Sequence, residues 1–201
     1  MIENGFYKIN VGFIDLINSL GGKYADKKER PVFCCIEDKY VKSLFWAIPT
    51  SDLSHRSPEQ ISKIRGWCNE SGIRSAYYHI GYTNRPAIYR ISSCFPITEK
   101  YIDSEYISQG VHVILKNKKE IAIIQQKLHR ILFDESIHPN KYEQHMTDIR
   151  NYLVEEMEAD KERAAQTLST EPERTPFNDL LVKQATESKQ MTKAKEKELD
   201  R

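Results

Sequence analysis

Residues 31–49 read PVFCCIEDKYVKSLFWAIP, which is two apolar runs with a polar segment between them. The first run, 32–36, is continuous and follows a proline, which favours a strand. Residues 37–39 are a turn signal, and the second run, 44–48, returns as the next strand and ends at Pro49. Because consecutive strands usually pair as a hairpin, the sequence predicts an antiparallel pair here.

Elements on either side of this pair indicate a mixed fold. Residues 6–9 alternate as a short strand, after which Asn10 can cap a helix, and a Ser-Pro-Glu-Gln capping box at 57–60 begins another. We expect further strands over 75–80, 87–94 and 111–115, and two amphipathic helices within 116–168. Short strands interrupted by helices, followed by a helical second half, predict an α+β fold with a small, strongly curved antiparallel sheet and external helices.

Composition separates a folded part from a tail. The chain has 201 residues, 39% of them hydrophobic, which suits one domain with an appendage. From residue 169 onward the one apolar cluster, 177–182, is too small to offset the entropy of ordering roughly thirty residues. We therefore expect an ordered domain over 1–168 and a mostly disordered, charged tail over 169–201.

The sequence predicts neither export nor membrane insertion. No apolar run reaches the ~18–20 residues that span a bilayer, and the first residues lack the basic and apolar regions of a signal peptide. The four cysteines, Cys34, Cys35, Cys68 and Cys94, show no C-x-x-C or Cys/His ligand spacing. We expect a cytoplasmic protein with buried, reduced thiols and with no metal or cofactor.

A formal net charge of +1 conceals an uneven distribution. Between Lys23 and Arg90 there are 12 bases and 7 acids, whereas from Glu155 to Arg201 there are 9 bases and 12 acids. Any attraction to nucleic acid must therefore be local. On charge alone, an ordinary solvated surface is the simpler interpretation.

Residues 49–56, PTSDLSHR, connect the end of a core strand to the start of a helix. They present Thr50, Ser51, His55 and Arg56 beside free backbone N–H groups, which together suit an anion such as phosphate. The commoner use of such hydroxyls is a turn that caps its own backbone, and a lone histidine is more often structural. Both interpretations remain open from the sequence.

A second loop, residues 23–31, carries four bases and an aromatic residue: Lys23, Tyr24, Lys27, Lys28 and Arg30. In an antiparallel hairpin the start of the first strand lies opposite the end of the second. We therefore expect Lys28 and Arg30 to lie next to Thr50 and Ser51. Arg85, in the loop before the 87–94 strand, is a further candidate cation.

A cluster of Lys, Arg, Ser, Thr and His without paired carboxylates suits metal-free cleavage of RNA. The substrate's own 2′-OH attacks the adjacent phosphorus, so the protein has to align it, stabilise the non-bridging oxygens and move protons. DNA lacks the 2′-OH and would be spared. Candidate base-stacking residues are Tyr24, Trp46, Tyr77, Tyr78 and Tyr82, although Trp46 lies in an apolar strand and is expected in the core.

Four segments together are similar to a known family. They are FYKI at 6–9, RPVF at 30–33, WAIPTS at 46–51 and YRISSCFPIT at 89–98. Over roughly residues 5–155 the chain resembles the ToxN/AbiQ family of type III toxin–antitoxin endoribonucleases, and most closely its CptN branch. The strand–Pro–Thr–Ser step is the most specific part of the resemblance.

The resemblance implies an SH3-like barrel core with external helices. It also implies sequence-preferring RNA cleavage that leaves a 2′,3′-cyclic phosphate and a 5′-hydroxyl, used to arrest growth or abort phage infection. The implied partner is an antitoxin RNA, a repeated small pseudoknot that the toxin cuts from its precursor and holds in closed protein–RNA rings.

Carried over to this sequence, Thr50 and Ser51 match the family's hydroxyl pair, which binds phosphate and stabilises the transition state. The family has a lysine where the Pro-containing strand starts; here none directly follows Pro31, so Lys28 or Arg30 would replace it. Leu53 stands where ToxN has a further lysine, so His55 or Arg56 would take that role. The expected catalytic residues are Thr50, Ser51, Lys28, Arg30 and His55, and the expected RNA contacts are Lys23, Tyr24, Lys27, Arg56, Tyr82, Arg85 and Arg90.

Two other functions fit the same features. The first is a non-catalytic module of the same fold that binds structured RNA through its basic loops. The second is a protein-interaction scaffold that acts through the helices expected over 117–168.

Overall fold

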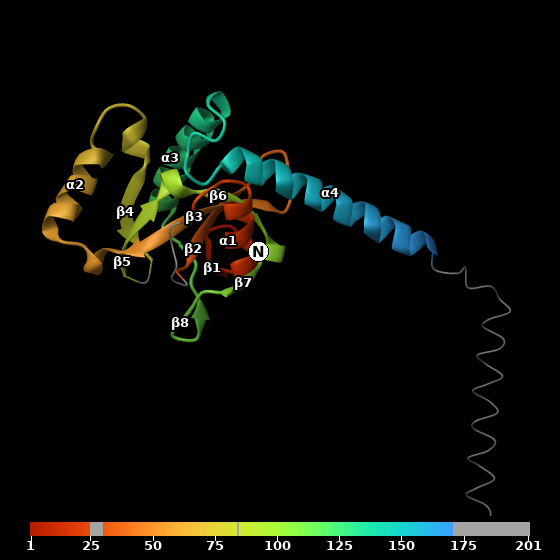
Figure 1. Ribbon diagram of the computed structural model, residues 1–201. Helices are drawn as coiled ribbons and strands as arrows, with labels where there is room; N and C mark the ends of the chain where they lie inside the picture. The colour runs from red at the N-terminus through yellow and green to blue at the C-terminus, as the bar shows by residue number, and fades with distance from the viewer. Residues whose placement is uncertain (25–29, 84, 171–201) are drawn as a thin grey trace, which may run out of the picture. The chain divides into compact units, whose positions relative to one another are not determined.

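The computed structural model describes residues 1–24, 30–83 and 85–170, with side chains to residue 167 (Figure 1). The chain divides into two units, Met1–Met157 and a second that begins at Glu158. The described part of the second unit is helical throughout. The tail expected over 169–201 lies outside the described residues, apart from its first two positions, which are helical.

Nine strands and four α-helices make up the described chain. In chain order the elements are β1 (Gly5–Ile9), α1 (Val11–Ser19), β2 (Val32–Glu37), β3 (Leu44–Asp52), α2 (Pro58–Cys68), β4 (Tyr78–Tyr82), β5 (Pro86–Arg90), β6 (Phe95–Thr98), β7 (Ile102–Glu105), β8 (Ile107–Ser108), β9 (Val111–His112), α3 (Lys118–Ile137) and α4 (Met146–Thr170). Short 3-10 helices occupy Leu53–His55, Ile73–Ala76, Ile91–Ser93 and Glu99–Tyr101. Nowhere in the described ranges is a helix both long and apolar enough to cross a lipid bilayer.

The strands form one antiparallel sheet of seven strands and a separate β8–β9 hairpin. The order in the main sheet is β4-β5-β3-β2-β1-β7, and β6 also pairs with β3. The predicted α+β class with an antiparallel sheet is therefore confirmed. The described strands do not close into a barrel, so the SH3-like barrel that the resemblance implies is not confirmed.

The central β2–β3 hairpin forms as predicted, with Val32 opposite Pro49 and Phe33 opposite Ile48. The predicted end of the second strand is wrong, because β3 continues through Pro49 to Asp52. On its other edge β3 pairs with β6 along Leu44–Ala47 and with β5 along Thr50–Asp52. Pro49 lies in the gap between these two partners, where the missing N–H of a proline interrupts no ladder.

The remaining elements follow the sequence signals in part. Asn10 and Ser57 cap α1 and α2, and the Ser57–Gln60 capping box is complete. The three later strands are shorter than expected: β4 begins only at Tyr78, β5 ends at Arg90, and β9 is two residues long. The strands β6 and β7 were not expected, because each is four residues long and has no clear alternation.

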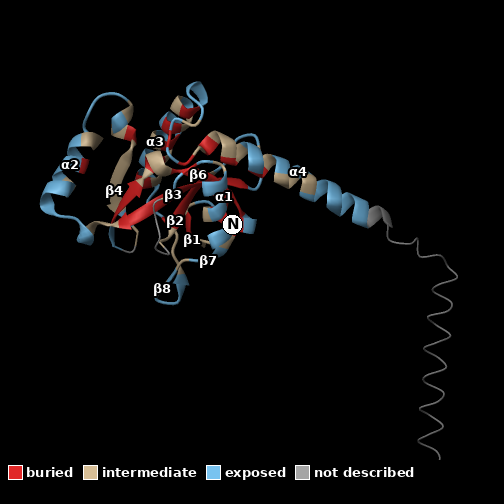
Figure 2. Ribbon diagram, in the orientation of Figure 1, coloured by how far each residue is buried: buried red, intermediate tan, exposed pale blue. Residues whose placement is uncertain are grey.

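Side chains of the central strands alternate between two cores. One core combines Phe6, Phe33 and Trp46 with the inner side of α3, and the other combines Tyr7, Val32 and Phe45 with the inner side of α1. Figure 2 shows the buried residues gathered in the central strands, with exposed residues on the outer turns of the helices. A strand covered on both faces needs apolar residues at every position, which explains the uninterrupted run at 32–36.

Trp46 links the hairpin to α4. Its side chain is 6% exposed, and its indole Nε1 donates a hydrogen bond to Asp38 Oδ2 at 3.2 Å. The same carboxylate accepts two hydrogen bonds from Arg150 of α4, each 3.0 Å long. The indole therefore packs in the core and also donates a hydrogen bond to a buried carboxylate.

The Trp46→Ala variant is expected to lower the free energy of unfolding by about 3–5 kcal/mol, because it leaves a cavity in the core. Urea unfolding followed by circular dichroism measures this loss. Tyr40→Ala is the matched control, since Tyr40 lies in the same hairpin and is 80% exposed; it should cost under about 1 kcal/mol. Equal losses in the two variants would contradict a core role for Trp46.

Candidate functional site

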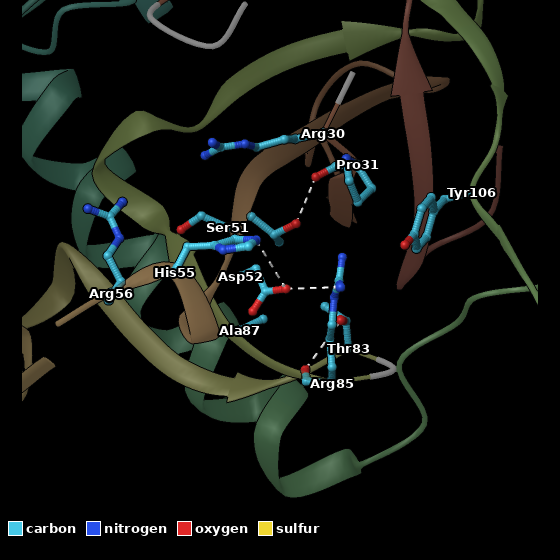
Figure 3. Close-up of a pocket in the computed structure, with 11 residues that line it drawn as sticks. Arg30, Pro31, Ser51, Asp52, His55, Arg56, Thr83, Arg85, Ala87 and Tyr106 are labelled. Carbon is cyan, nitrogen blue, oxygen red and sulfur yellow. Dashed lines mark hydrogen bonds and ion pairs between the residues drawn. The ribbon is translucent and has the colours of Figure 1, made fainter. Parts of the chain in front are cut away.

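A pocket of about 360 Å³ lies at the open end of the β2–β3 hairpin (Figure 3). Its lining includes three arginines, Arg30, Arg56 and Arg85, together with the segment from Thr50 to Asp52 and with His55. Pro31, Thr83, Ala87 and Tyr106 also line it. The pocket therefore combines residues from both loops that the sequence singled out.

Strand pairing explains why these residues meet. The pairing of Val32 with Pro49 places Arg30 beside the end of β3. On the other edge, Ser51 lies opposite Ile88 and Asp52 opposite Ala87, which brings the β4–β5 turn and its Arg85 to the same place. The expected meeting of Arg30 with the two hydroxyls is thus present in the structure.

The two adjacent hydroxyls have different surroundings. Thr50 Oγ1 donates a hydrogen bond to the carbonyl oxygen of Pro31 at 2.8 Å and so ties β3 to the segment that carries Arg30. Ser51 Oγ is buried and has no hydrogen-bond partner among the described residues. Since both residues are on a strand and under a tenth exposed, neither is the turn cap that the sequence left open.

Asp52 organises the cationic side of the pocket. Its carboxylate accepts hydrogen bonds from the backbone N–H of Ser54 at 2.7 Å and from the Ser54 hydroxyl at 2.6 Å. It also pairs with Arg85 Nη1 at 3.0 Å and lies 3.9 Å from His55 Nε2. The hydrogen bonds from Ser54, and then the charge of Arg85, lower the pKa of Asp52, so the carboxylate is ionised at neutral pH.

Sequence reasoning gave Asp52 no role, although a signal was present. An aspartate two residues before a serine commonly caps the next turn, and here Asp52 caps the 3-10 helix that carries His55. Tyr106 was also missed. It reaches the pocket because its backbone N–H bonds to the carbonyl of Phe6, a long-range contact without a local sequence signal.

The charged side chains of the lining make it cationic. With His55 neutral, the described lining residues include three arginines and one aspartate, a formal charge of +2. In Figure 3 Arg30 and Arg85 extend from opposite sides of the Ser51–Asp52 segment. Guanidinium groups bind phosphate oxygens in a bidentate manner, so the lining suits a phosphate group.

Among the described residues, the others expected to contact RNA or to act in catalysis are not found in the pocket lining. Lys27 and Lys28 lie outside the described residues. Lys23, Tyr82 and Arg90 are described but are not among the residues that line the pocket, and Tyr24 packs edge-on against Phe95 at 5.7 Å in a core cluster.

Most of the residues expected to stack on RNA bases pack against other side chains of the protein. Tyr78 stacks on Trp67 with 5.5 Å between ring centroids, and Tyr77 packs edge-on against Tyr142. Trp46 is buried, as its position in an apolar strand predicted. Tyr82 is 62% exposed and is the one member of the predicted set with an open ring.

The cysteines are free, and three of them are buried. Burial raises the pKa of Cys34 and of Cys35 to about 12, and burial also raises the pKa of Cys94. Cys68 is half-buried and donates its thiol hydrogen to the carbonyl of Tyr78. Among residues 1–24, 30–83 and 85–170, no three His, Cys, Asp or Glu side chains are grouped as metal ligands.

Labelling of the native protein with Ellman's reagent at pH 8 is expected to modify at most one thiol, that of Cys68. The thiolate is the reactive form, and burial suppresses it at Cys34, Cys35 and Cys94. The labelled residue is identified by mass spectrometry, and denatured protein, with four reactive thiols, is the control. Rapid native labelling of Cys34 or Cys94 would contradict the described core.

No protein-family model matches this sequence, and no curated protein is significantly similar to it. The pocket brings together a buried hydroxyl that has no partner among the described residues, three arginines, and a neighbouring aspartate and histidine.

Proposed function

We propose that the protein is a metal-independent endoribonuclease, the toxin of a type III toxin–antitoxin system related to ToxN/AbiQ, and that the pocket holds the scissile phosphodiester. The observation that carries the proposal is the hydroxyl of Ser51, which is buried, has no hydrogen-bond partner in the described part of the chain, and lies on a pocket lined by three arginines. A buried polar atom without a partner costs free energy unless a ligand satisfies it.

RNA supplies hydrogen-bond acceptors for the donors of this pocket. A phosphodiester offers oxygen atoms that accept hydrogen bonds from Ser51 and from the guanidinium groups. Its negative charge matches the formal charge of +2 on the lining. The resemblance in sequence adds the chemical class of the reaction, and the pocket supplies the residues.

The reaction is a transesterification within the RNA. The 2′-oxygen forms a bond to phosphorus while the bond to the 5′-oxygen breaks, which leaves a 2′,3′-cyclic phosphate and a 5′-hydroxyl. One proton leaves the 2′-OH and one reaches the departing oxygen. Ser51 and Arg30 stabilise charge on the non-bridging oxygens, and His55 carries out one of the proton transfers.

In this scheme Thr50 and Asp52 hold other residues of the pocket in place. The Thr50 hydroxyl holds the Pro31 carbonyl and thereby fixes Arg30, whereas Asp52 holds Arg85 and faces His55. Both are positioning residues, because their polar atoms are engaged with protein groups.

The Ser51→Ala variant is expected to cleave RNA at least about a hundredfold more slowly than the wild type, because it removes a hydrogen-bond donor to the charge that develops in the transition state. Wild-type protein is incubated with RNA and EDTA, and the product ends are tested for the 2′,3′-cyclic phosphate. Ser19→Ala, a serine on the surface of α1, is the matched control and should leave the rate unchanged. RNA binding by the wild type without cleavage would instead favour the non-catalytic RNA-binding module.

The Arg30→Ala variant is expected to weaken RNA binding and to reduce the slope of log affinity against log salt by about 0.7, the value for one lost contact to a single strand. Filter binding in the Ser51→Ala background measures this without cleavage. Arg74→Ala is the control, since Arg74 lies outside the pocket and pairs with Glu70. An unchanged salt slope for Arg30→Ala would show that this side chain does not meet phosphate.

The proposed partner is a repeated pseudoknot antitoxin RNA, held across the same pocket in closed protein–RNA rings. Tandem short repeats followed by a terminator, immediately upstream of the coding region, would support this pairing. RNA transcribed from those repeats should then inhibit cleavage. If this RNA does not inhibit cleavage, the proposed antitoxin is wrong. The nuclease activity is tested separately, by the Ser51→Ala variant.

A further inference from the structure

A second pocket, of about 670 Å³, lies at the turn end of the β2–β3 hairpin, where the hairpin faces α3 and the first turns of α4. Its apolar wall consists of Ile36, Trp46, Leu132 and Met146. None of the described residues lines both this pocket and the arginine-lined pocket. The two pockets therefore mark opposite ends of the same hairpin.

Glu135 of α3 lines this second pocket and is only 4% exposed. Its Oε1 accepts three hydrogen bonds: from the backbone N–H of Asn140 at 2.8 Å, the backbone N–H of Thr147 at 3.2 Å and the Thr147 hydroxyl at 2.7 Å. Its Oε2 is buried and has no hydrogen-bond partner among the described residues. Three donors thus fix one oxygen, while none of the described residues donates a hydrogen bond to the other.

The charge of this pocket is opposite to that of the first. Burial alone would raise the pKa of Asp38, but the hydrogen bonds from Arg150 and from nearby backbone outweigh it and lower the pKa, so this pair is ionised and neutral in sum. The other charged lining residues are Glu3, Glu37 and Glu135 against Lys39, a formal charge of −2. An anionic ligand is therefore disfavoured here, and a cationic one is favoured.

We propose that this pocket binds a small organic cation that joins a flat apolar body to an amine or amidinium group. The charged group donates a hydrogen bond to Glu135 Oε2, and the apolar body packs against Trp46, Leu132 and Met146. Glu135 lines this pocket, and the terminal torsion of a glutamate is soft, so its carboxylate can turn toward the ligand. A few convergent polar groups on an apolar wall are typical of sites for small molecules.

This site is independent of the proposed nuclease function, and so is its test. The full-length protein is titrated with benzamidine, a flat amidinium, and with benzamide, a neutral molecule of nearly the same shape. Isothermal titration calorimetry gives the affinity, and thermal unfolding gives an independent readout. Benzamidine is expected to bind and to raise the melting temperature, whereas benzamide should bind at least about tenfold more weakly.

Two variants assign the binding to this pocket. Glu135→Gln keeps an oxygen for the three donors and removes the charge, so it should weaken benzamidine binding at least about tenfold. Ser136→Trp, at an exposed position of the lining, should block the pocket without touching Glu135, which preserves the test if the first variant folds poorly. Glu70→Gln, remote from the lining, should bind as the wild type does.

Three outcomes would overturn the proposal. The first is no saturable binding of benzamidine up to about 10 mM, the upper range for a weak site. The second is equal affinity for benzamidine and benzamide, because the carboxylate would then play no part. The third is unchanged benzamidine binding in folded Glu135→Gln or in Ser136→Trp, because the ligand would then lie elsewhere.

Discussion

The candidate site depends on the hydrogen bond from the Thr50 hydroxyl to the carbonyl of Pro31, which joins the two strands of the central hairpin at their open end. It closes the open end of the β2–β3 hairpin and fixes the start of β2 against the end of β3. On the other edge Thr50 lies opposite Tyr89, so β5 is aligned by the same residue. Arg30 on one side and Arg85 on the other therefore reach one pocket because a single residue of β3 pairs in both directions.

The hairpin also divides the interior. Its side chains alternate between a core under α3 and a core under α1, and Trp46 and Phe45 belong to different cores although they are neighbours in sequence. A shift of the β2–β3 register by one residue would exchange these faces. The cores thus fix the register that places Thr50 and Ser51, so packing at the middle of the strand determines chemistry at its end.

Much of this arrangement could be predicted from local patterns. The antiparallel pairing follows from two apolar runs around a polar turn, and it brings Arg30 to the same pocket as Ser51. The continuation of β3 past Pro49 could not be predicted, because it depends on β5, which lies more than thirty residues later in the chain. The same reason explains why Tyr106 was missed, and why the distinct surroundings of Thr50 and Ser51 could only be seen in three dimensions.

The two ends of the hairpin carry opposite formal charges, +2 around the arginines and −2 around Glu135. Such a separation gives this part of the molecule an electric dipole along the strand direction. The field of a polyanion exerts a torque on this dipole as the protein approaches, and at low salt it acts over roughly a Debye length before any contact forms. The first encounter is therefore biased toward the arginine end, and this orienting effect should fade as ionic strength rises.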